Sequence, residues 1–266
     1  MKPPTIEFAS PSDVAENCAV PWEVIKHSTY QDLLIKPEYL ARKARFQPGK
    51  TWIRLLPPLA GSRSWILGIN SLNYEGGRHP HAKTLTSGAG NSSVFDHAYA
   101  WCLRNKPNSL YSKTNKDGYK LLSDPVFMFW ALLEENGKTV ARLVIGSGYD
   151  GSRGGASGLG HQFLKLAQER DENGNLASNP AHPDSGVQIC VEKTQSKDSR
   201  FPSYALRVGR VAAPIGEFLE RMEPTEIAAL ASLKDIVNLP TPDEEWKLLE
   251  KVIDPETVAE IRAAQA

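Results

Sequence analysis

Aromatic rings and cations are interleaved in one part of this sequence, residues 71–125. Tyrosine and tryptophan rings stack on unpaired bases, and Lys and Arg neutralise the phosphates between those bases. Mixed in this way, the two residue types predict a surface for single-stranded nucleic acid. The candidate contacts in this segment are Arg78, Lys83, Tyr99, Trp101, Arg104, Lys106, Tyr111, Lys113, Tyr119 and Lys120.

A second set of candidates lies on predicted strands, the first of which runs between a Pro48-Gly49 turn and paired prolines at 57–58. Alternation along a strand places Trp52 and Arg54 on one side and Ile53 on the other. The Ile53 side can serve a core, while the other side offers a ring and a guanidinium to a ligand. A half-buried strand with its Arg in solvent would show the same pattern. The candidates on this and the later strands are Arg45, Trp52, Arg54, Phe129, Trp130, Arg142, Lys193, Tyr204 and Arg207.

Charge is sorted along the chain, although the net charge is zero. Residues 1–35 hold 2 basic and 5 acidic side chains, a balance of −3, and residues 36–120 hold 14 and 4, a balance of +10. Residues 121–216 hold 10 of each, and residues 217–266 hold 5 basic and 12 acidic side chains, a balance of −7. A basic segment suits a polyanion, and an acidic end could compete with that ligand or bind a basic partner. An uneven but simply solvated surface would give the same balance.

Composition and length bound the class of protein. The 266 residues are 41% hydrophobic and 23% charged, which is typical of a soluble globular protein. No apolar run is long enough for a membrane span, and the first residues lack the apolar stretch of a signal peptide. Cys18, Cys102 and Cys190 are scattered without a Cys-x-x-Cys pair, which favours reduced thiols. We therefore expect a cytoplasmic protein with no membrane partner.

Hydrophobic periodicity predicts strands first and acidic helices last. A helix is expected around 159–168, and helices separated by prolines are expected after residue 214. An Asn136-Gly137 hairpin turn joins the third and fourth strands. This order predicts a mainly β fold with flanking helices, of the α+β class. The expected strands lie near residues 50–56, 64–70, 126–133, 138–145, 187–192 and 204–209.

Two other kinds of site have partial support in the sequence. Residues 146–151 match Gly-x-Gly-x-x-Gly after a strand, but more glycines follow before the helix and the strand belongs to a hairpin, which favours a flexible loop over a dinucleotide site. His79, His81, His97 and Cys102 could ligate zinc, although their spacing is not that of a familiar zinc module. No nucleophile elbow, metalloprotease helix or phosphate-binding loop is found, so we predict no catalytic residue and no cofactor.

The order of these motifs resembles that of the replication single-stranded-DNA-binding, or helix-destabilising, proteins of tailed bacteriophages. Trp52-Ile53-Arg54-Leu55-Leu56-Pro57 looks like that family's first-strand motif of an apolar residue, Arg, two apolar residues and Pro. A Lys/Asn/Tyr-rich segment at 110–120 and the aromatic strand at 127–133 follow in the family's order. The run Ile189-Cys190-Val191-Glu192-Lys193 and the strand with Tyr204 complete a resemblance that covers residues 40–215.

The resemblance implies a five-stranded oligonucleotide-binding (OB) barrel with a large insertion between strands 2 and 3. Residues 1–39 would form an N-terminal arm, residues 40–215 the barrel with its insertion at 71–125, and residues 216–266 an acidic helical region that contacts replication or recombination proteins. The chain departs from some relatives in having only Cys102 in the insertion and an acidic N-terminal segment. Carried over by position, the expected DNA contacts are Arg54, Tyr111, Lys113, Tyr119, Lys120 and Trp130.

The resulting hypothesis is a non-enzymatic protein that coats and protects single-stranded DNA with little sequence preference. It would remove secondary structure from the DNA during phage replication or recombination. Two alternatives stay open. One is a nucleotide-dependent enzyme that uses the loop at 146–151, and the other is an RNA-binding or recombination-mediator module built on the same barrel.

Overall fold

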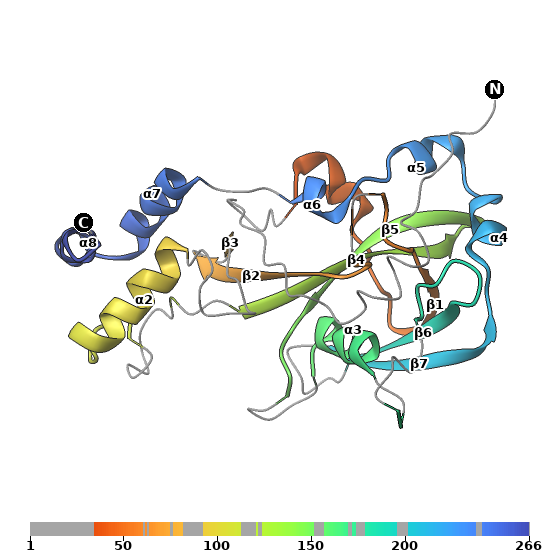
Figure 1. Cartoon of the computed structure of the whole chain (residues 1–266), viewed down its shortest axis with the longest axis horizontal. Helices are drawn as coiled ribbons and strands as arrows, with labels where there is room; N and C mark the ends of the chain where they lie inside the picture. Colours follow the sequence, from red (N-terminus) through yellow and green to blue (C-terminus); the bar gives the residue numbers. More distant parts are fainter. Residues whose placement is uncertain are drawn as a thin grey trace. The chain divides into compact units, whose positions relative to one another are not determined.

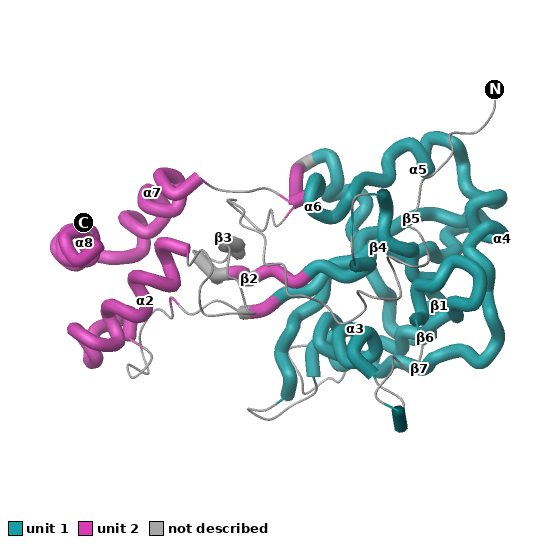
Figure 2. Tube along the Cα trace, viewed as in Figure 1, with its two compact units in different colours: residues 1–21, 38–67, 126–236 teal, residues 22–37, 68–125, 237–266 magenta. Residues whose placement is uncertain are grey.

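A computed structural model describes residues 35–60, 62, 64–74, 77–81, 93–112, 121, 124–151, 157–169, 172–173, 179–195, 202–237 and 241–265, and Figure 1 shows their helices and strands. The chain forms two compact units, which Figure 2 colours separately. Unit 1 comprises residues 1–21, 38–67 and 126–236, and unit 2 comprises residues 22–37, 68–125 and 237–266. Most of the predicted N-terminal arm, up to residue 34, lies outside the described residues.

Five strands of unit 1 form an open antiparallel sheet. They are β1 (Gly49–Leu55), β4 (Asp124–Glu135), β5 (Lys138–Ser147), β6 (Val187–Thr194) and β7 (Ser203–Ala212). Their order is β5-β4-β1-β6-β7, and each neighbouring pair is antiparallel. Within the described residues β5 and β7 do not pair with each other, so this sheet is not closed. A mixed α/β fold with an antiparallel sheet is thus confirmed, whereas the predicted closed five-stranded barrel is not shown.

The hairpin of β4 and β5 confirms the predicted Asn-Gly turn. Asn136 and Gly137 have φ values of 53° and 75°, the left-handed conformation that both central residues of a type I′ turn adopt. Asn and Gly accept this conformation at little steric cost, so the turn fixes the register of the two strands. The paired positions run from Val126 opposite Ser147 to Glu135 opposite Lys138.

Cross-strand register sorts the side chains of the sheet into two faces, because directly opposed residues lie on the same side. Ile53 and Leu55 of β1 are fully buried on one face, and the register places Phe129 of β4 on that face too. Helix α3 (Leu159–Gln168) packs there, with the ring centroids of Phe163 and Phe129 4.4 Å apart. We call this the helix face. The opposite face, which carries Trp52, is called the distal face.

Glycines allow α3 to lie close to β5. A Cβ atom on Gly146 would collide with the backbone of Gly160, and a Cβ atom on Gly158 would collide with Ser147. Helix α3 begins at Leu159, beyond the Gly-x-Gly-x-x-Gly pattern, and β5 runs antiparallel to β4. A dinucleotide site needs a helix that starts within the motif and a parallel strand. The described glycines at 146, 158 and 160 instead allow α3 to pack closely on β5.

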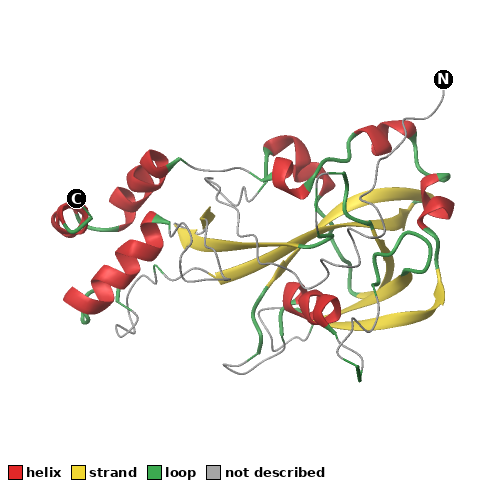
Figure 3. Ribbon diagram, in the orientation of Figure 1, coloured by secondary structure: helices red, strands yellow, loops and turns green. Residues whose placement is uncertain are grey.

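Part of the distal face is covered by the end of unit 1. The short helices α4 (Ile215–Leu219), α5 (Pro224–Ala228) and α6 (Leu233–Ile236) follow β7, and η1 (Pro37–Arg42) precedes β1; all are red in Figure 3. Acidic residues of this segment pair with cations of the same unit. Glu226 lies 2.9 Å from Arg42, and Glu223 lies 3.1 Å from Lys138. The acidic balance after residue 216 is therefore partly neutralised within unit 1.

In unit 2 the predicted insertion, residues 71–125, packs with the last helices of the chain. Strands β2 (Leu67–Tyr74) and β3 (Gly77–His81) form an antiparallel hairpin. Helix α2 (Val94–Asn105) shares one buried apolar cluster with α7 (Pro242–Val252) and α8 (Pro255–Ala263). Phe95, Cys102, Leu249 and Ile261 of this cluster are almost completely buried. The last two helices are thus part of the core of this unit.

Polar caps fix the same three helices. Ser93 caps the start of α2, and the buried carboxylate of Glu245 in α7 accepts a hydrogen bond from Val94 N at 2.9 Å. Asp254 caps the start of α8 by accepting from Thr257 N at 2.8 Å, and this bond holds the pKa of Asp254 below its ordinary value. Because Glu245 satisfies an amide at the first turn of α2, α7 stabilises the insertion directly.

Candidate nucleic-acid interface

The exposed part of the distal face is centred on Trp52 of β1. Trp52 is 51% exposed, whereas most large apolar side chains of the sheet are buried. It opposes Cys190 of β6, which in turn opposes Arg207 of β7. Two positions further along β1, Lys50 opposes Glu192, which opposes Ala205. We call the set Lys50, Trp52, Glu192, Ala205 and Arg207 the Trp52 surface.

The side chains of the Trp52 surface are close enough to contact one short ligand. Neighbouring strands are ~4.8 Å apart and alternate residues of one strand are ~6.8 Å apart, so the backbone positions of Lys50 and Arg207 lie within about 10 Å of Trp52. Cys190, between Trp52 and Arg207, is short and 1% exposed, so it forms no ridge between the ring and the guanidinium. A ring with one cation along the strand and another across the strands suits a base and its neighbouring phosphates.

Arg207 forms an ion pair on this surface, with Nη2 3.0 Å from Glu192 Oε2. The side chain of Arg207 is 65% exposed and that of Glu192 is 29% exposed. An exposed pair of this kind contributes at most about 1 kcal/mol, because water screens both charges. Arg207 can therefore exchange this carboxylate for a phosphate oxygen at small cost.

Arg54 does not belong to the Trp52 surface, in contrast to the sequence prediction. The residue is 0% exposed, and burial lowers the pKa of Arg54 to about 10, which leaves it charged at neutral pH. Backbone carbonyls accept hydrogen bonds from all five N–H donors of its guanidinium. The prediction that Arg54 contacts a phosphate is therefore wrong, and Arg54 instead connects β1 to the segments that supply these carbonyls. Nε donates to Ala213 O at 2.6 Å, Nη1 to Leu55 O at 2.8 Å and Pro180 O at 2.9 Å, and Nη2 to His182 O at 2.5 Å and Pro183 O at 3.4 Å.

Phe129 and Trp130 are buried as well, which corrects their prediction as stacking platforms. Phe129 is 0% exposed on the helix face. Trp130 is 3% exposed, and its indole Nε1 donates to Ala231 O at 2.9 Å. Tyr39 meets the Trp130 ring edge-on, with centroids 6.5 Å apart. Both rings belong to the core of unit 1, so a base could reach neither without unfolding part of that core.

Lys193 and Tyr204 oppose each other on β6 and β7 and lie on the helix face. The ammonium of Lys193 donates to Phe46 O at 2.8 Å. Tyr204 is half-buried, and burial raises the pKa of its hydroxyl. The structure thus places these two candidates on the other side of the sheet from Trp52.

Arg142 and Arg45 differ in how accessible their guanidinium groups are. Arg142 donates to both carboxylate oxygens of Glu135, at 2.9 and 2.5 Å, and its Nη1 lies 3.7 Å from Glu226. Arg45 is exposed in the segment that leads into β1. Arg45 is therefore the more accessible of the two for a phosphate.

Candidates in unit 2 are engaged with the C-terminal helices. Lys106 Nζ lies 2.5 Å from Glu260 Oε2 and 3.0 Å from Thr257 Oγ1, and its bond to Glu260 raises the pKa of Lys106. The hydroxyl of Tyr111 accepts from Asp254 N at 3.1 Å, and burial raises the pKa of Tyr111. Lys106 is thus held by side chains of α8, and Tyr111 is held by the backbone of Asp254, which caps α8.

The remaining aromatic candidates of unit 2 are partly covered. Tyr99 and Trp101 are half-buried against the apolar cluster, and Lys106 Nζ lies 5.7 Å from the centroid of the Trp101 ring. Arg104 is exposed on α2. Of Arg78 only the backbone is described, on β3, and Lys83, Lys113, Tyr119 and Lys120 lie outside the described residues.

The candidate zinc ligands are not brought together where they are described. Across the described segments of the chain, no group of three His, Cys, Asp or Glu residues is placed to hold a metal ion. His97 is exposed, whereas Cys102 is 0% exposed and burial raises its pKa to about 11. The side chains of His79 and His81 lie outside the described residues.

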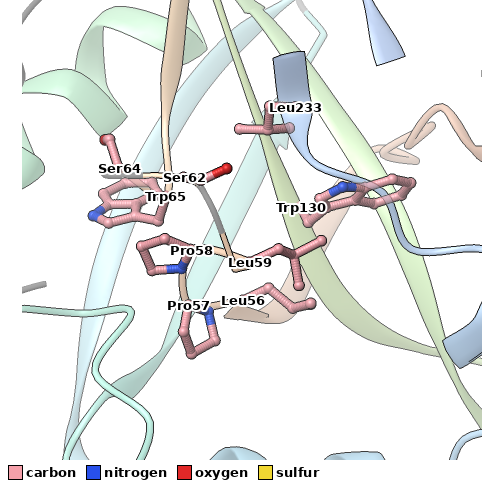
Figure 4. Close-up of a pocket in the computed structure, with 9 residues that line it drawn as sticks. All are labelled: Leu56, Pro57, Pro58, Leu59, Ser62, Ser64, Trp65, Trp130 and Leu233. Carbon is pink, nitrogen blue, oxygen red and sulfur yellow. The ribbon is translucent and has the colours of Figure 1, made fainter. Parts of the chain in front are cut away.

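A small cavity beside Trp130 is not a ligand site. Its free space is about large enough for a single water molecule, too little for a base or a nucleotide. The hydroxyl of Ser62 in its wall lies 2.9 Å from that of Ser232. Figure 4 shows the lining residues Leu56, Pro57, Pro58, Leu59, Ser62, Ser64, Trp65, Trp130 and Leu233.

Sequence reasoning did not single out Lys50, Glu192 or Ala205. A signal for Lys50 was present, because it lies two positions before Trp52 and alternate residues of a strand share a face. Glu192 and Ala205 could not be found this way, since their position beside Lys50 depends on the pairing of β1 with β6 and of β6 with β7.

Comparison with known proteins does not assign the chain to a family. No protein-family model matches it, and a search of curated proteins found no match. Among the described residues no helix has the length and apolar character that crossing a bilayer requires.

Proposed function

We propose that the chain binds single-stranded DNA through the Trp52 surface. The observation that carries this proposal is the half-exposed Trp52 ring, with Lys50 two positions along the same strand and Arg207 two strands away on the same face of the sheet. A flat apolar ring with two cations nearby suits an unpaired base, which stacks on the ring while the cations contact its phosphates.

Affinity on this surface has two sources. Stacking on an aromatic side chain contributes about 1–3 kcal/mol per base, and Lys and Arg add a salt-dependent term by releasing counterions from the phosphates. Neither source reads base identity, so we expect little sequence preference. Because the protein binds only unpaired strands, it removes hairpins by mass action and needs no nucleotide hydrolysis.

The resemblance to the replication single-stranded-DNA-binding proteins of tailed bacteriophages agrees with this proposal. Under it, the open sheet of unit 1 corresponds to the strands of an OB barrel, and residues 71–125, which lie in unit 2, are its insertion. We propose a role in coating DNA during replication or recombination in a host cytoplasm, with protein partners at the acidic end of the chain. A recombination mediator that uses the same surface is a narrower form of this proposal.

RNA is the second candidate ligand, because stacking and phosphate contacts do not distinguish the sugars. Discrimination needs a contact to the 2′-hydroxyl. Oligo-dT and oligo-U of equal length, titrated under the same salt, separate the two. Tighter binding of oligo-U would favour the RNA-binding alternative.

The test of the proposal is fluorescence anisotropy of a labelled oligo-dT at low salt. Trp52→Ala should weaken binding about 5- to 150-fold, which corresponds to the loss of one stacked base, and Trp52→Phe should restore part of it. Lys50→Ala should also weaken binding, whereas its matched control Lys165→Ala should not, because Lys165 is exposed on α3 over the helix face. Equal affinity of Trp52→Ala and wild type would refute the proposed site.

A further inference from the structure

The edge of the sheet formed by β7 is a second surface suited to a partner. Strand β7 ends the strand order and, in the part of the chain that the structure describes, pairs with β6 alone. Figure 1 shows it along the border of the sheet, next to β6. The backbone N–H and C=O groups along such an edge can pair with another extended chain.

Among the described residues, a side chain of the same unit bonds the backbone near the beginning of this edge. Gln162 Nε2 of α3 donates to the carbonyl of Tyr204 at 2.8 Å. The stretch that follows, residues 205–211, is called the β7 edge. Its regular pairing with β6 extends to Val208, and the register shifts between Val208 and Ala212, so residues 205–208 are the regular part of this edge.

The side chains of the β7 edge are apolar and basic. Val208 is 44% exposed and Val211 is 79% exposed, so the exposed fraction of Val211 exceeds that of Trp52. Arg207 and Arg210 are also exposed, and β7 contains no acidic residue. A partner that complements this edge therefore carries acidic side chains together with small apolar ones.

A second copy of the chain fits this edge poorly. Antiparallel pairing of β7 with itself would bring four arginines onto one two-stranded ribbon, where like charges at opposed or diagonal positions are destabilising. The neighbouring carboxylate, Glu192, is already paired with Arg207. Charge thus disfavours a homodimer through β7 and favours an acidic chain.

We propose that the β7 edge binds an extended acidic segment of a partner protein by strand addition. Main-chain hydrogen bonds to β7 would supply affinity, and Arg210 with the exposed valines would select an acidic, β-branched sequence. This surface goes beyond the proposed DNA-binding function. Ala205 and Arg207 belong to both surfaces, but strand addition uses Arg210 and the backbone of β7 rather than the ring of Trp52, so it does not depend on whether the Trp52 surface binds DNA.

The test uses the full-length chain and two synthetic ten-residue peptides, one alternating Val and Glu and the other alternating Val and Lys. Amide hydrogen exchange with and without each peptide reports strand addition residue by residue. The acidic peptide should slow exchange within residues 205–211, and the basic peptide should not. Arg210→Glu should weaken binding of the acidic peptide about five- to tenfold, while Arg210→Lys should largely retain it.

Several outcomes would overturn this proposal. They are equal binding of both peptides, binding without slower exchange at 205–211, and unchanged affinity in Arg210→Glu. Protection of these amides by oligo-dT but not by the acidic peptide would assign the edge to nucleic acid instead. Concentration-dependent protection of the chain alone would assign it to a second copy. Lys165→Glu, which reverses an exposed charge on α3, controls for net charge.

Discussion

Replacing Arg54 by Met should destabilise unit 1 strongly without removing a DNA contact. Met keeps much of the aliphatic length but leaves the carbonyls of Leu55, Pro180, His182 and Ala213 without the donor that lies within 3 Å of each. Each buried carbonyl left without a donor costs about 1–3 kcal/mol, so the loss over these four carbonyls should be at least about 3 kcal/mol. That is a large part of the roughly 5–15 kcal/mol that holds a typical domain together.

Urea unfolding followed by circular dichroism measures this effect. The midpoint should fall while the slope of the free energy of unfolding against urea stays unchanged, since the fold is the same. Arg207→Met is the matched control, and because Arg207 is exposed it should change stability by at most about 1 kcal/mol. Below its midpoint, Arg54→Met should bind oligo-dT as wild type does. A loss of less than about 1 kcal/mol would refute the structural role of Arg54.

Three further predictions follow from buried groups. Gly186→Ala should lower stability, because a Cβ there would collide with the Arg54 guanidinium and with His182 O, and urea unfolding should give a lower midpoint. Cys102 should not react with a thiol reagent at neutral pH in the native protein, because burial raises its pKa to about 11, but should react once urea unfolds the chain. Burial lowers the pKa of His161 in the folded state. The unfolded state therefore binds the imidazole proton more tightly than the folded state does. Protonation of His161 should thus lower the free energy of unfolding as the pH falls through about 6.5. The NMR titration of His161, and a weaker acid dependence in His161→Gln, check this sign; a pKa above the ordinary value would contradict it.

Local signals in the sequence predicted local structure well. The Asn136-Gly137 turn and the helix around 159–168 were confirmed, because turn chemistry and apolar periodicity act over a few residues. Trp52 was correctly placed on the side of β1 opposite Ile53, and its ring is exposed there. Arg54 shares that face but is buried, since segments far along the chain, at 180–183 and at Ala213, supply its acceptors.

Contacts between distant segments could not be predicted from the sequence. Packing of α7 and α8 against α2 brings Glu260 to Lys106 and Asp254 to Tyr111, across about 150 residues of chain, and no local pattern marks those pairs. The interleaved rings and cations of the insertion therefore suggested a continuous binding surface. In the structure two of those candidates, Lys106 and Tyr111, are engaged within unit 2, while the half-exposed ring of Trp52 lies on the sheet of unit 1.

The most direct test of the account is the salt dependence of oligo-dT binding by wild type and by the double variant Lys50→Ala/Arg207→Ala. Each phosphate contact to a single strand adds about 0.7 to the slope of log affinity against log salt. The slope of log affinity against log salt should be shallower by about 1.4 in the double variant, while Lys165→Ala should keep the wild-type slope. Identical slopes for the double variant and wild type, or no binding of oligo-dT at low salt, would contradict the assignment of the Trp52 surface as the DNA site.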